Sequence, residues 1–227
     1  MRDEIKGVAF DLDGTLYPNY RLNLRLIPFV LKEWRMLAAF GKARNIIRKE
    51  QEKSQPCRDC FYEHQAEITA QILKVPAGPL KNKIDSQIYK GWEPLFKKIK
   101  LFEYVIETLE ELKKAGYKLG LLSDFPPETK LEYLNISGFW DAVQCSEHSG
   151  ALKPHPLSFT ELACAMNLPA QNILYVGNSY LYDVAGAAGA GMKTAWIKSR
   201  FVSDRKKMPK PDFSFHSYRH LYDFMLK

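Results

Sequence analysis

No apolar stretch in this 227-residue sequence is long enough to cross a membrane. A membrane-spanning helix needs about 20 consecutive, mostly apolar residues, whereas the apolar run over residues 27–40 is broken by Lys32, Glu33 and Arg35. The first residues also lack the basic and then apolar pattern of a secretory signal. We therefore expect a protein without a membrane segment.

Cysteine is scarce, with four residues in the whole chain. So few cysteines do not form a disulfide framework in a chain of this length, and we expect a reducing, cytoplasmic environment. Cys57, Cys60 and His64 have a spacing that could supply three zinc ligands, but no fourth ligand is evident. We favour two loop cysteines here, although the sequence alone leaves metal binding open.

Internal repeats, low-complexity tracts, a helix-turn-helix signature and an RNA-binding aromatic motif are also absent from the sequence. Hydrophobic residues make up 46% of the chain and charged residues 26%, which is typical of a folded protein and too apolar for a disordered one. The length allows one large domain, or one domain with a sizeable insertion. Nothing in the sequence indicates an oligomeric state.

The positive charge is concentrated in one segment. Residues 17–98 contain 16 Lys and Arg against 8 Asp and Glu, whereas the rest of the chain contains 17 against 18. A basic segment can attract an anionic ligand, or it can be a solvated helical surface. Because no nucleic-acid-binding motif accompanies the charge, we expect a small anionic molecule as the partner and no nucleic acid.

Short apolar runs bounded by turn residues predict buried strands. They cover residues 6–10, 118–122, 142–145, 172–176 and 193–197, with a short edge strand expected at 212–215. Helical patterns occupy residues 102–114, 127–136, 156–166, 181–188 and 217–226. This alternation predicts an α/β fold in which a doubly wound, Rossmann-like parallel sheet has helices on both faces.

The segment 17–98 departs from this alternation because it contains no convincing strand. Helical patterns lie near residues 22–40, 42–53, 60–73 and 79–90, divided by Gly41, Pro56 and residues 76–79. About 80 residues are too many for a structureless loop in a compact domain. We therefore expect residues 1–16 and 99–227 to form the α/β core, and residues 17–98 to form an inserted α-helical cap domain.

The first predicted strand leads directly into two carboxylates, Asp11 and Asp13, followed by Gly14 and Thr15. Residues two apart in an extended chain point the same way, and like charges this close are costly unless a cation neutralises them. Such a pair can bind Mg²⁺, act as a nucleophile and act as a general acid. A solvent-exposed turn is the alternative for this pattern.

Further polar residues follow the other predicted strands, and the carboxyl ends of parallel strands are where ligands bind in such sheets. These residues are Ser123, Lys153, Asn178 and Asp183. Ser123 and Lys153 could bind phosphoryl oxygens, and Asn178 and Asp183 could bind a hard cation. Each also has a structural alternative, such as a capping Ser, a solvated Lys or an acid at a helix N-terminus.

Taken in order, these motifs resemble those of the haloacid dehalogenase superfamily of phosphohydrolases. Residues 10–16 match its first motif, Ser123 its second, Lys153–Pro154 its third, and residues 177–187 its fourth. The resemblance covers residues 5–16 and 99–227. The segment inserted after the first motif resembles the helical cap of the subclass that carries one at this point.

The resemblance implies a role for each residue that matches a motif. Asp11 is expected to be the nucleophile that becomes an aspartyl-phosphate, and Asp13 the general acid and base. Thr15, Ser123 and Lys153 are expected to orient the loop and hold the phosphoryl group, with Asp124 beside them. Mg²⁺ is the expected cofactor, held by Asp11, the backbone carbonyl of Asp13, Asn178 and Asp183.

The chain departs from the family pattern at Asn178, where most members have Asp. An amide keeps an oxygen donor but removes a negative charge, so we expect weaker Mg²⁺ binding than in a relative with Asp. Asp124, which follows Ser123 where many relatives have Asn, is a candidate to restore some of that charge.

The expected activity is Mg²⁺-dependent hydrolysis of a small phosphate monoester. A haloacid dehalogenase is one alternative, but such enzymes need no metal and usually lack the second Asp of the first motif, which Asp13 provides here. A phosphomutase of the same fold and a non-catalytic phosphate-binding relative are the others. Asn178 is the only support for the non-catalytic reading.

Overall fold

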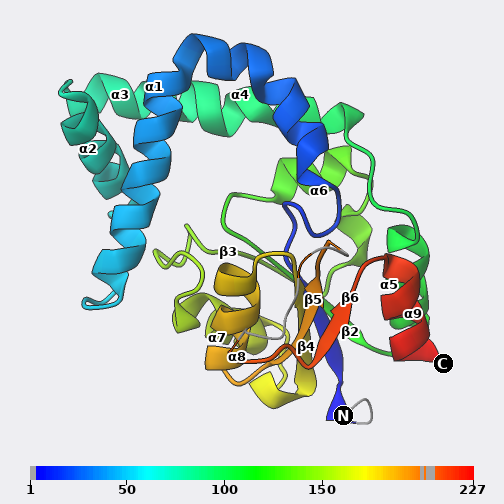
Figure 1. Ribbon diagram of the computed structural model, residues 1–227. Coiled ribbons are helices and arrows are strands. Elements are labelled where there is room, and N and C mark those ends of the chain that lie inside the picture. Colours follow the sequence, from blue (N-terminus) through cyan, green and yellow to red (C-terminus); the bar gives the residue numbers. More distant parts are fainter. Residues whose placement is uncertain (1–3, 200–201, 203–207) are drawn as a thin grey trace.

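The computed structural model describes residues 4–199, 202 and 208–227. The first residues of the expected core, 1–3, therefore lie outside the described part of the chain. Six strands in the described part form one sheet (Figure 1), and they are β1 (Gly7–Phe10), β2 (Lys118–Ser123), β3 (Ala142–Cys145), β4 (Ile173–Gly177), β5 (Lys193–Ile197) and β6 (Phe213–Phe215).

The strand order across the sheet is β3-β2-β1-β4-β5-β6, and every pairing is parallel. β1 lies in the middle, with Phe10 opposite Leu121 of β2 and Val176 of β4. All four residues of β1 are buried, as expected for a strand that is covered on both faces. The chain runs outward from β1 through β2 and β3 on one side, and then returns to the other side of β1 for β4, β5 and β6. This is the doubly wound arrangement that the sequence predicts.

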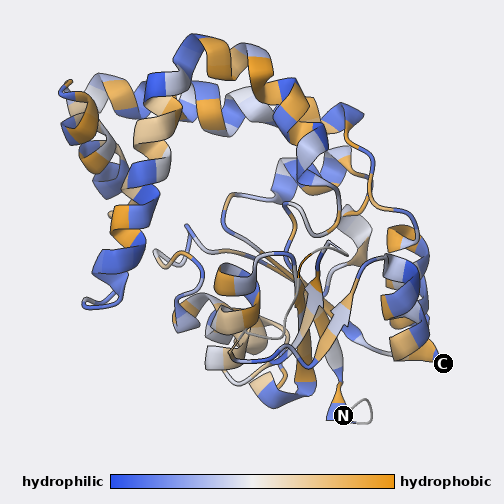
Figure 2. Cartoon of the chain, in the orientation of Figure 1, coloured by the Kyte–Doolittle hydropathy of each residue, from blue (hydrophilic) through white to orange (hydrophobic). Residues whose placement is uncertain are grey.

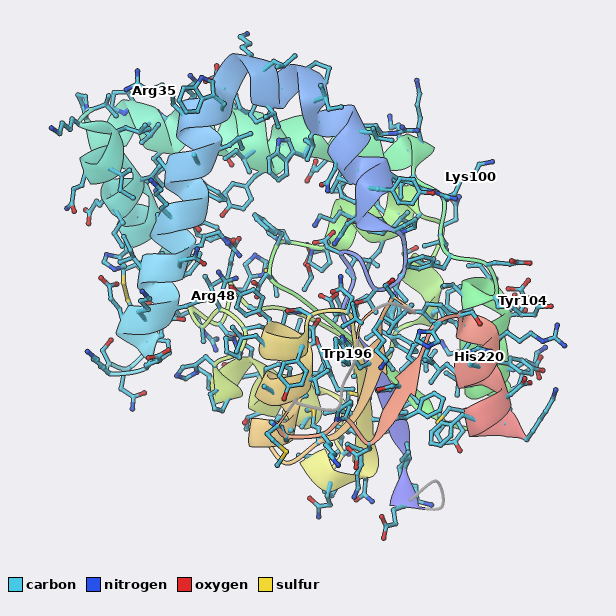
Figure 3. The ribbon with its side chains drawn as sticks, in the orientation of Figure 1. Arg35, Arg48, Lys100, Tyr104, Trp196 and His220 are labelled. Carbon is cyan, nitrogen blue, oxygen red and sulfur yellow. A yellow bond between two sulfur atoms is a disulfide. The ribbon has the colours of Figure 1, made fainter. Side chains whose placement is uncertain are left out.

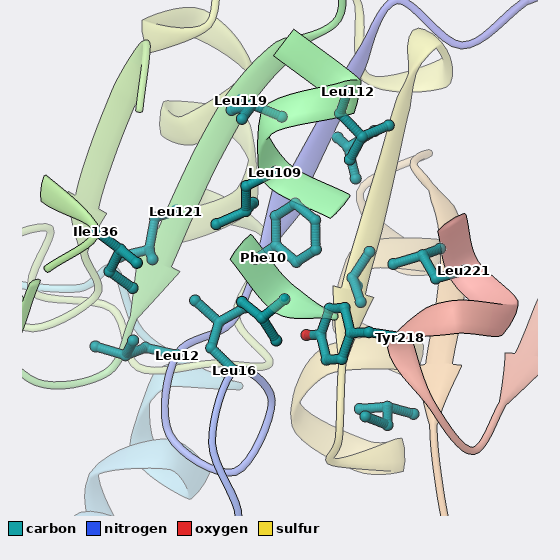
Figure 4. Packing of buried hydrophobic residues seen from close by; sticks show 14 of the residues in the cluster. Phe10, Leu12, Leu16, Leu109, Leu112, Leu119, Leu121, Ile136, Tyr218 and Leu221 are labelled. Atoms are coloured by element: carbon teal, nitrogen blue, oxygen red, sulfur yellow. The ribbon is translucent and has the colours of Figure 1, made fainter. Parts of the chain in front are cut away.

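Helices cover both faces of this sheet (Figure 1). Alternate residues of β1 point to opposite faces, so that Val8 and Phe10 join one apolar cluster and Ala9 joins the other. The first cluster packs against α5 (Val105–Lys114), α6 (Glu128–Tyr133) and α9 (Tyr218–Leu226), and Figure 4 shows its side chains around Phe10. The second packs against α7 (Pro156–Ala165) and α8 (Gly186–Gly189).

Every element between residues 19 and 98, a stretch that the structure describes throughout, is helical. These elements are α1 (Asn19–Gln51), α2 (Phe61–Leu73), α3 (Ala77–Ile84), the π-helical turn η2 (Asp85–Tyr89), α4 (Lys90–Trp92) and the 3₁₀ turn η3 (Glu93–Lys98). Figure 1 shows them as an arch beyond the carboxyl end of β1. Figure 2 shows apolar and polar residues interleaved along these helices, whose apolar sides pack on one another.

Helix α1 corrects one expectation, because it runs through Gly41 without a break. Phe40 and Ala43 on either side of Gly41 are buried, and their packing outweighs the low helix propensity of a single glycine. The break lies instead at Glu33, which has non-helical backbone angles, one and a half turns after Pro28 inside the helix. Proline lacks a backbone N–H and crowds the turn before it, so Pro28 acts on residues 24–28 and does not account for the angles at Glu33.

Three other predicted helices are shorter or more varied than expected. The helix predicted at 127–136 is reduced to α6, and the one predicted at 181–188 begins as a π-helical turn, η6 (Tyr180–Ala185). The pattern at 79–90 is divided among α3, η2 and α4. Short turns of 3₁₀ helix, η4 (Ser137–Phe139) and η5 (Ala170–Asn172), precede β3 and β4. None of the described helices is long and apolar enough to span a membrane.

The continuity of α1 predicts the effect of replacing Gly41. A side chain added at Gly41 meets no atom within 4 Å. Gly41→Ala should therefore raise the free energy of unfolding by about 1 kcal/mol, because alanine has the higher helix propensity. Urea denaturation measures this change. Gly116→Ala is the matched control, because Gly116 has a φ of +85° and alanine there should instead cost about 1 kcal/mol. A loss of stability in Gly41→Ala would contradict a continuous α1.

Candidate active site

The polar residues singled out in the sequence lie at one edge of the sheet. Asp11 follows β1, Ser123 ends β2 and Asn178 follows β4. Lys153 lies in the loop between β3 and α7, and Asp183 lies in η6. Because all the strands are parallel, their carboxyl ends meet at this edge, as the sequence predicted from the strand ends alone.

Lys153 is the centre of the site. Its ammonium Nζ lies 2.7 Å from Oδ1 of Asp11 and 2.7 Å from Oδ1 of Asp183, and it donates to the Tyr175 hydroxyl at 3.4 Å. Asp11, Lys153 and Asp183 are all buried, with 5%, 3% and 1% of their surface exposed. Burial alone would lower the pKa of Lys153, but Asp11 and Asp183 outweigh burial and hold the pKa well above its ordinary value.

Asp11 is held at both carboxylate oxygens. Oδ1 accepts from Lys153, and Oδ2 accepts from the hydroxyl of Thr15 at 2.6 Å. Burial raises the pKa of Asp11 to about 7, and the charge of Asp183 adds to the increase while Lys153 opposes it. The position of the carboxylate is therefore fixed, whereas its negative charge is poorly solvated.

Two glycines allow the chain to close around these carboxylates. A Cβ at Gly177 would lie 2.2 Å from the Cβ of Asp183, so only a bare backbone lets Asp183 fold back over the end of β4. The returning carboxylate accepts the backbone N–H of Ser179 at 2.8 Å. A Cβ at Gly14 would lie 2.2 Å from Nδ2 of Asn178. This contact places Asn178 against the loop that carries Asp11 and Asp13.

Asp13 lies beside the central group with partners of its own. Both of its carboxylate oxygens accept from Nζ of Lys130, at 2.9 and 3.1 Å, and one also accepts from the hydroxyl of Tyr17. Tyr17 is fully buried, and burial together with Asp13 raises the pKa of its hydroxyl. Lys130, from α6, has no signal in the sequence because it follows no strand. Asp13 would have to be known as its partner to find it.

Ser123 is fully buried at the end of β2. Its hydroxyl accepts the backbone N–H of Phe125 at 3.2 Å, and its carbonyl accepts the N–H of Ser146 at 2.8 Å. The first contact is the local capping that a serine at a loop start can make. The hydroxyl still has a proton to donate, so Ser123 can cap the loop and bind an anion at once.

The eight predicted residues thus all lie at this edge of the sheet. A family model described as haloacid dehalogenase-like hydrolase matches residues 5–191 of the chain. The chain belongs to the haloacid dehalogenase-like hydrolases. As a member of that family, it is a hydrolase.

Relatives within this family include enzymes with different reactions. The chain is 28% identical to a glyceraldehyde 3-phosphate phosphatase of Methanopyrus kandleri over 96% of each chain. It is 24% identical to haloacetate dehalogenase H-2 of a Moraxella species over 93% of each chain. Its fold matches that of the L-2-haloacid dehalogenase RSc1362 with a TM-score of 0.69, at 20% identity over 98% of this chain and 99% of that one. The phosphatase relative supports a phosphatase, and the dehalogenase likenesses, which share the fold, do not outweigh it.

Asp124 differs from the other predicted residues because its carboxylate also contacts the helical arch. It accepts from Arg48 of α1 at 2.7 Å and from the backbone N–H of Lys153 at 3.1 Å, and Arg44 lies 3.5 Å away. Burial would raise the pKa of Asp124, but Arg44, Lys153 and Arg48 together lower it. Figure 3 labels Arg48 on the C-terminal half of α1. Arg48 also donates to the carbonyl of Lys153 at 2.8 Å.

The basic helical segment therefore uses two of its arginines to contact residues that follow the strands. Arg44 also forms a buried ion pair with Glu147, which accepts the hydroxyl of Tyr89 at 3.0 Å as well. Gln51, one turn beyond Arg48, donates to the carbonyl of Gly150 at 2.6 Å. The charge of Arg44 and Arg48 is thus used within the molecule, which the sequence did not indicate.

Oxygen atoms dominate the potential metal ligands of this hydrolase. Within the described residues, no group of three or more His, Cys, Asp or Glu side chains is arranged to hold a metal ion. Cys57 and Cys60 are joined by a disulfide bond, and Nε2 of His64 lies 2.7 Å from Oε2 of Glu50.

The burial of Asp11 predicts a pH-dependent cost. An acid whose pKa is about 7 in the folded state, above its ordinary value of 3.8, binds its proton more tightly in the folded state. Its contribution to the free energy of unfolding therefore falls as the pH rises from about 4 to about 7. Without added metal, the free energy of unfolding of Asp11→Asn relative to that of the wild type should therefore rise by about 1–4 kcal/mol when the pH is raised from about 5 to about 8. Urea denaturation in a chelator at both pH values measures it, and a pH-independent difference contradicts it.

Proposed function

We propose that this hydrolase is a phosphatase that releases phosphate from a small phosphate monoester, with Asp11 as the nucleophile and Mg²⁺ as cofactor. The observation that carries the proposal is the pair of acids on one loop. Asp11 is fixed by Lys153 and Thr15, while Asp13, two residues later, is held separately by Lys130 and Tyr17. Two acids with different partners can act as nucleophile and as acid–base group.

In the first step, a carboxylate oxygen of Asp11 attacks phosphorus. The bond from phosphorus to the ester oxygen breaks, and Asp13 gives its proton to that leaving oxygen. The product is an alcohol and an aspartyl-phosphate on Asp11. Lys153, whose Nζ already contacts Asp11, offsets negative charge on the transferring oxygens, where electrostatics and positioning do most of the catalysis.

In the second step, Asp13 accepts a proton from water, and the water oxygen attacks phosphorus. The acyl-phosphate bond breaks, so that phosphate leaves and Asp11 is restored. One group thus serves first as acid and then as base, which closes the cycle without any net proton change on the enzyme. Dividing the displacement into two steps replaces one difficult barrier with two lower ones.

The phosphoryl group is proposed to lie among Thr15, Ser123 and Lys153. Ser123 retains a hydroxyl proton for a phosphoryl oxygen, and Lys153 provides the charge. We assign Asp124 an indirect role, since its carboxylate already binds Arg48 and the N–H of Lys153. It would hold the backbone of Lys153 in place.

The residues at the sheet edge fit a magnesium ion in the chemistry of their donors. Mg²⁺ prefers oxygen ligands and is commonly bound through one or two carboxylates, with water and substrate phosphate completing its coordination. Asp11 and Asp183 supply two buried carboxylates, and Asn178 and the carbonyl of Asp13 supply neutral oxygens. When bound, the ion would neutralise charge on the phosphate. Because Asn178 stands where a third carboxylate could lie, we expect Mg²⁺ to bind weakly.

We further propose that residues 17–98 act as a cap domain on a core of residues 1–16 and 99–227. The two segments that link cap and core lie side by side, because the N–H of Phe102 donates to the carbonyl of Leu16 at 2.9 Å. Arg21 and Arg25 donate to the carbonyls of Lys100 and Lys98, each at 2.8 Å. Bending at these links would admit substrate, and closure would exclude water.

The family resemblance and the phosphatase relative favour a small-molecule phosphate as the substrate. We also propose that the enzyme acts in the cytoplasm. Haloacid dehalogenation remains the second candidate, because dehalogenases are among the relatives and the similar folds. Asp13 favours the phosphatase, since halide leaves without a proton and needs no acid. Phosphomutase activity would return the phosphate to the product, and a non-catalytic role would leave the Asp11–Lys153 pair unused.

The function is tested by incubating the protein with p-nitrophenyl phosphate and with 2-chloropropionate, each with Mg²⁺ and with a chelator. We expect phosphate release that requires Mg²⁺ and no halide release. Asp11→Asn should lower the rate by at least about a thousandfold, because it removes the nucleophile. Halide release that is independent of metal would establish the dehalogenase instead.

Asn178→Asp provides the matched variant for the metal. A third carboxylate should lower the Mg²⁺ concentration that gives half-maximal activity by about tenfold, without requiring any change at Asp11. An unchanged Mg²⁺ requirement would show that Asn178 lies outside the metal's coordination.

A further inference from the structure

A cavity of about 620 Å³ lies between the helical arch and the loop after β2. Five aromatic side chains contribute to its walls, and they are Tyr62, Tyr89, Trp92, Phe96 and Phe125. The ring centroids of Tyr89 and Trp92 lie 5.9 and 6.3 Å from that of Phe125. The walls therefore present ring faces and edges from the arch and from the sheet domain to one space.

Lys130 connects this cavity to the candidate active site. It lines the cavity, and its Nζ lies 5.1 Å from the ring centre of Phe96 and 5.3 Å from that of Phe125. The same Nζ contacts both carboxylate oxygens of Asp13. The cavity thus ends at Lys130, which holds the carboxylate of Asp13, and its lining includes none of the proposed phosphate-binding residues.

The charges around the cavity do not suit a second anionic group. Lys81 pairs with Glu63, and Lys90 pairs with Asp85 at 2.7 Å. Lys130 is paired with Asp13, and the walls contain two further acids, Asp59 and Glu93. The lysines here are therefore matched by carboxylates, in contrast to the overall basic charge of residues 17–98.

The size of the cavity also exceeds what a short acyclic group needs. Cavities of about 300–1,000 Å³ typically enclose ligands of drug-like size. A planar ligand would bury its faces against the aromatic rings that line the cavity.

From these features we propose that the cavity binds the alcohol portion of the substrate, and that this portion carries a planar aromatic or heteroaromatic ring and no second phosphate. The proposal rests on the proposed phosphatase function and names its substrate class. The ester oxygen lies toward Asp13 and Lys130, the phosphate lies toward Lys153, and the ring lies among Phe96, Phe125 and Trp92. Hydrolysis releases the ring-bearing alcohol into the cavity.

The test compares two esters with the same kind of leaving group, 2-phenylethyl phosphate and propyl phosphate. Both release a primary alcohol, so a difference in rate reports the ring and not leaving-group chemistry. We expect kcat/KM in Mg²⁺ to be on the order of ten- to a hundredfold higher for the phenylethyl ester, from burial of the ring. Glyceraldehyde 3-phosphate serves as a second acyclic comparison and should follow propyl phosphate.

Variants locate the preference in the cavity. Trp92→Leu and Phe125→Leu keep apolar side chains but remove flat rings, and each should bring the ratio of the two kcat/KM values down by at least about fivefold. Trp34→Leu is the matched control, because Trp34 is 61% exposed on α1 and does not line the cavity. Its ratio should equal that of the wild type.

The outcomes separate this proposal from the function beneath it. Equal kcat/KM values for the two esters overturn the ring preference while leaving the phosphatase intact. A ring preference that survives both Trp92→Leu and Phe125→Leu overturns the cavity as its site. Absence of phosphate release from every ester in Mg²⁺ overturns the phosphatase function itself, and the substrate class falls with it.

Discussion

A buried lysine between two buried carboxylates organises this protein. Removing three charged groups from water is costly, and the cost is offset only when each charge is paired and hydrogen-bonded. Lys153 meets this requirement by contacting Asp11 and Asp183, while Thr15 and the N–H of Ser179 satisfy further carboxylate oxygens. Removing one member of such a group leaves an uncompensated charge, at a typical cost of about 3–5 kcal/mol. The site and the stability of the sheet edge are therefore linked.

The same arrangement suits the proposed chemistry. The three groups carry one net negative charge when the carboxylates are ionised, in a place that water reaches poorly. Such a site attracts a cation and holds a nucleophile in a single position before substrate arrives. The glycines at positions 14 and 177 make the arrangement possible, because side chains there would collide with Asn178 and Asp183.

Much of the sheet and of the candidate site could be predicted from the sequence. Short apolar runs marked the strands, and the rule that ligands bind at the carboxyl ends of parallel strands placed Asp11, Ser123, Lys153 and Asp183 together. Lys130 and Arg44 could not be found in this way, since they lie on helices and act through partners distant in the chain. Gly41 lies inside a helix and not at its boundary, because the burial of Phe40 and Ala43 outweighs the low helix propensity of glycine, which local sequence does not reveal.

The helical arch illustrates why charge composition alone is a poor guide to a ligand. Its excess of lysine and arginine suggested an anionic partner, yet Arg44 and Arg48 bind Glu147 and Asp124 of the sheet domain. The aromatic cavity lies under the same helices and is bordered by paired charges. What can bind here depends on which residues of the helical arch and of the sheet face one another, and not on the total charge of either.

The claim on which this account depends is that Asp11 is the group that becomes phosphorylated. Its most direct test is to quench the reacting enzyme with acid within milliseconds and to measure the mass of the peptide that contains Asp11. The account predicts a transient gain of one phosphoryl group on Asp11, which hydroxylamine removes as it does from an acyl phosphate. Turnover with no phosphoryl group on Asp11, or with the group on another residue, would contradict the account.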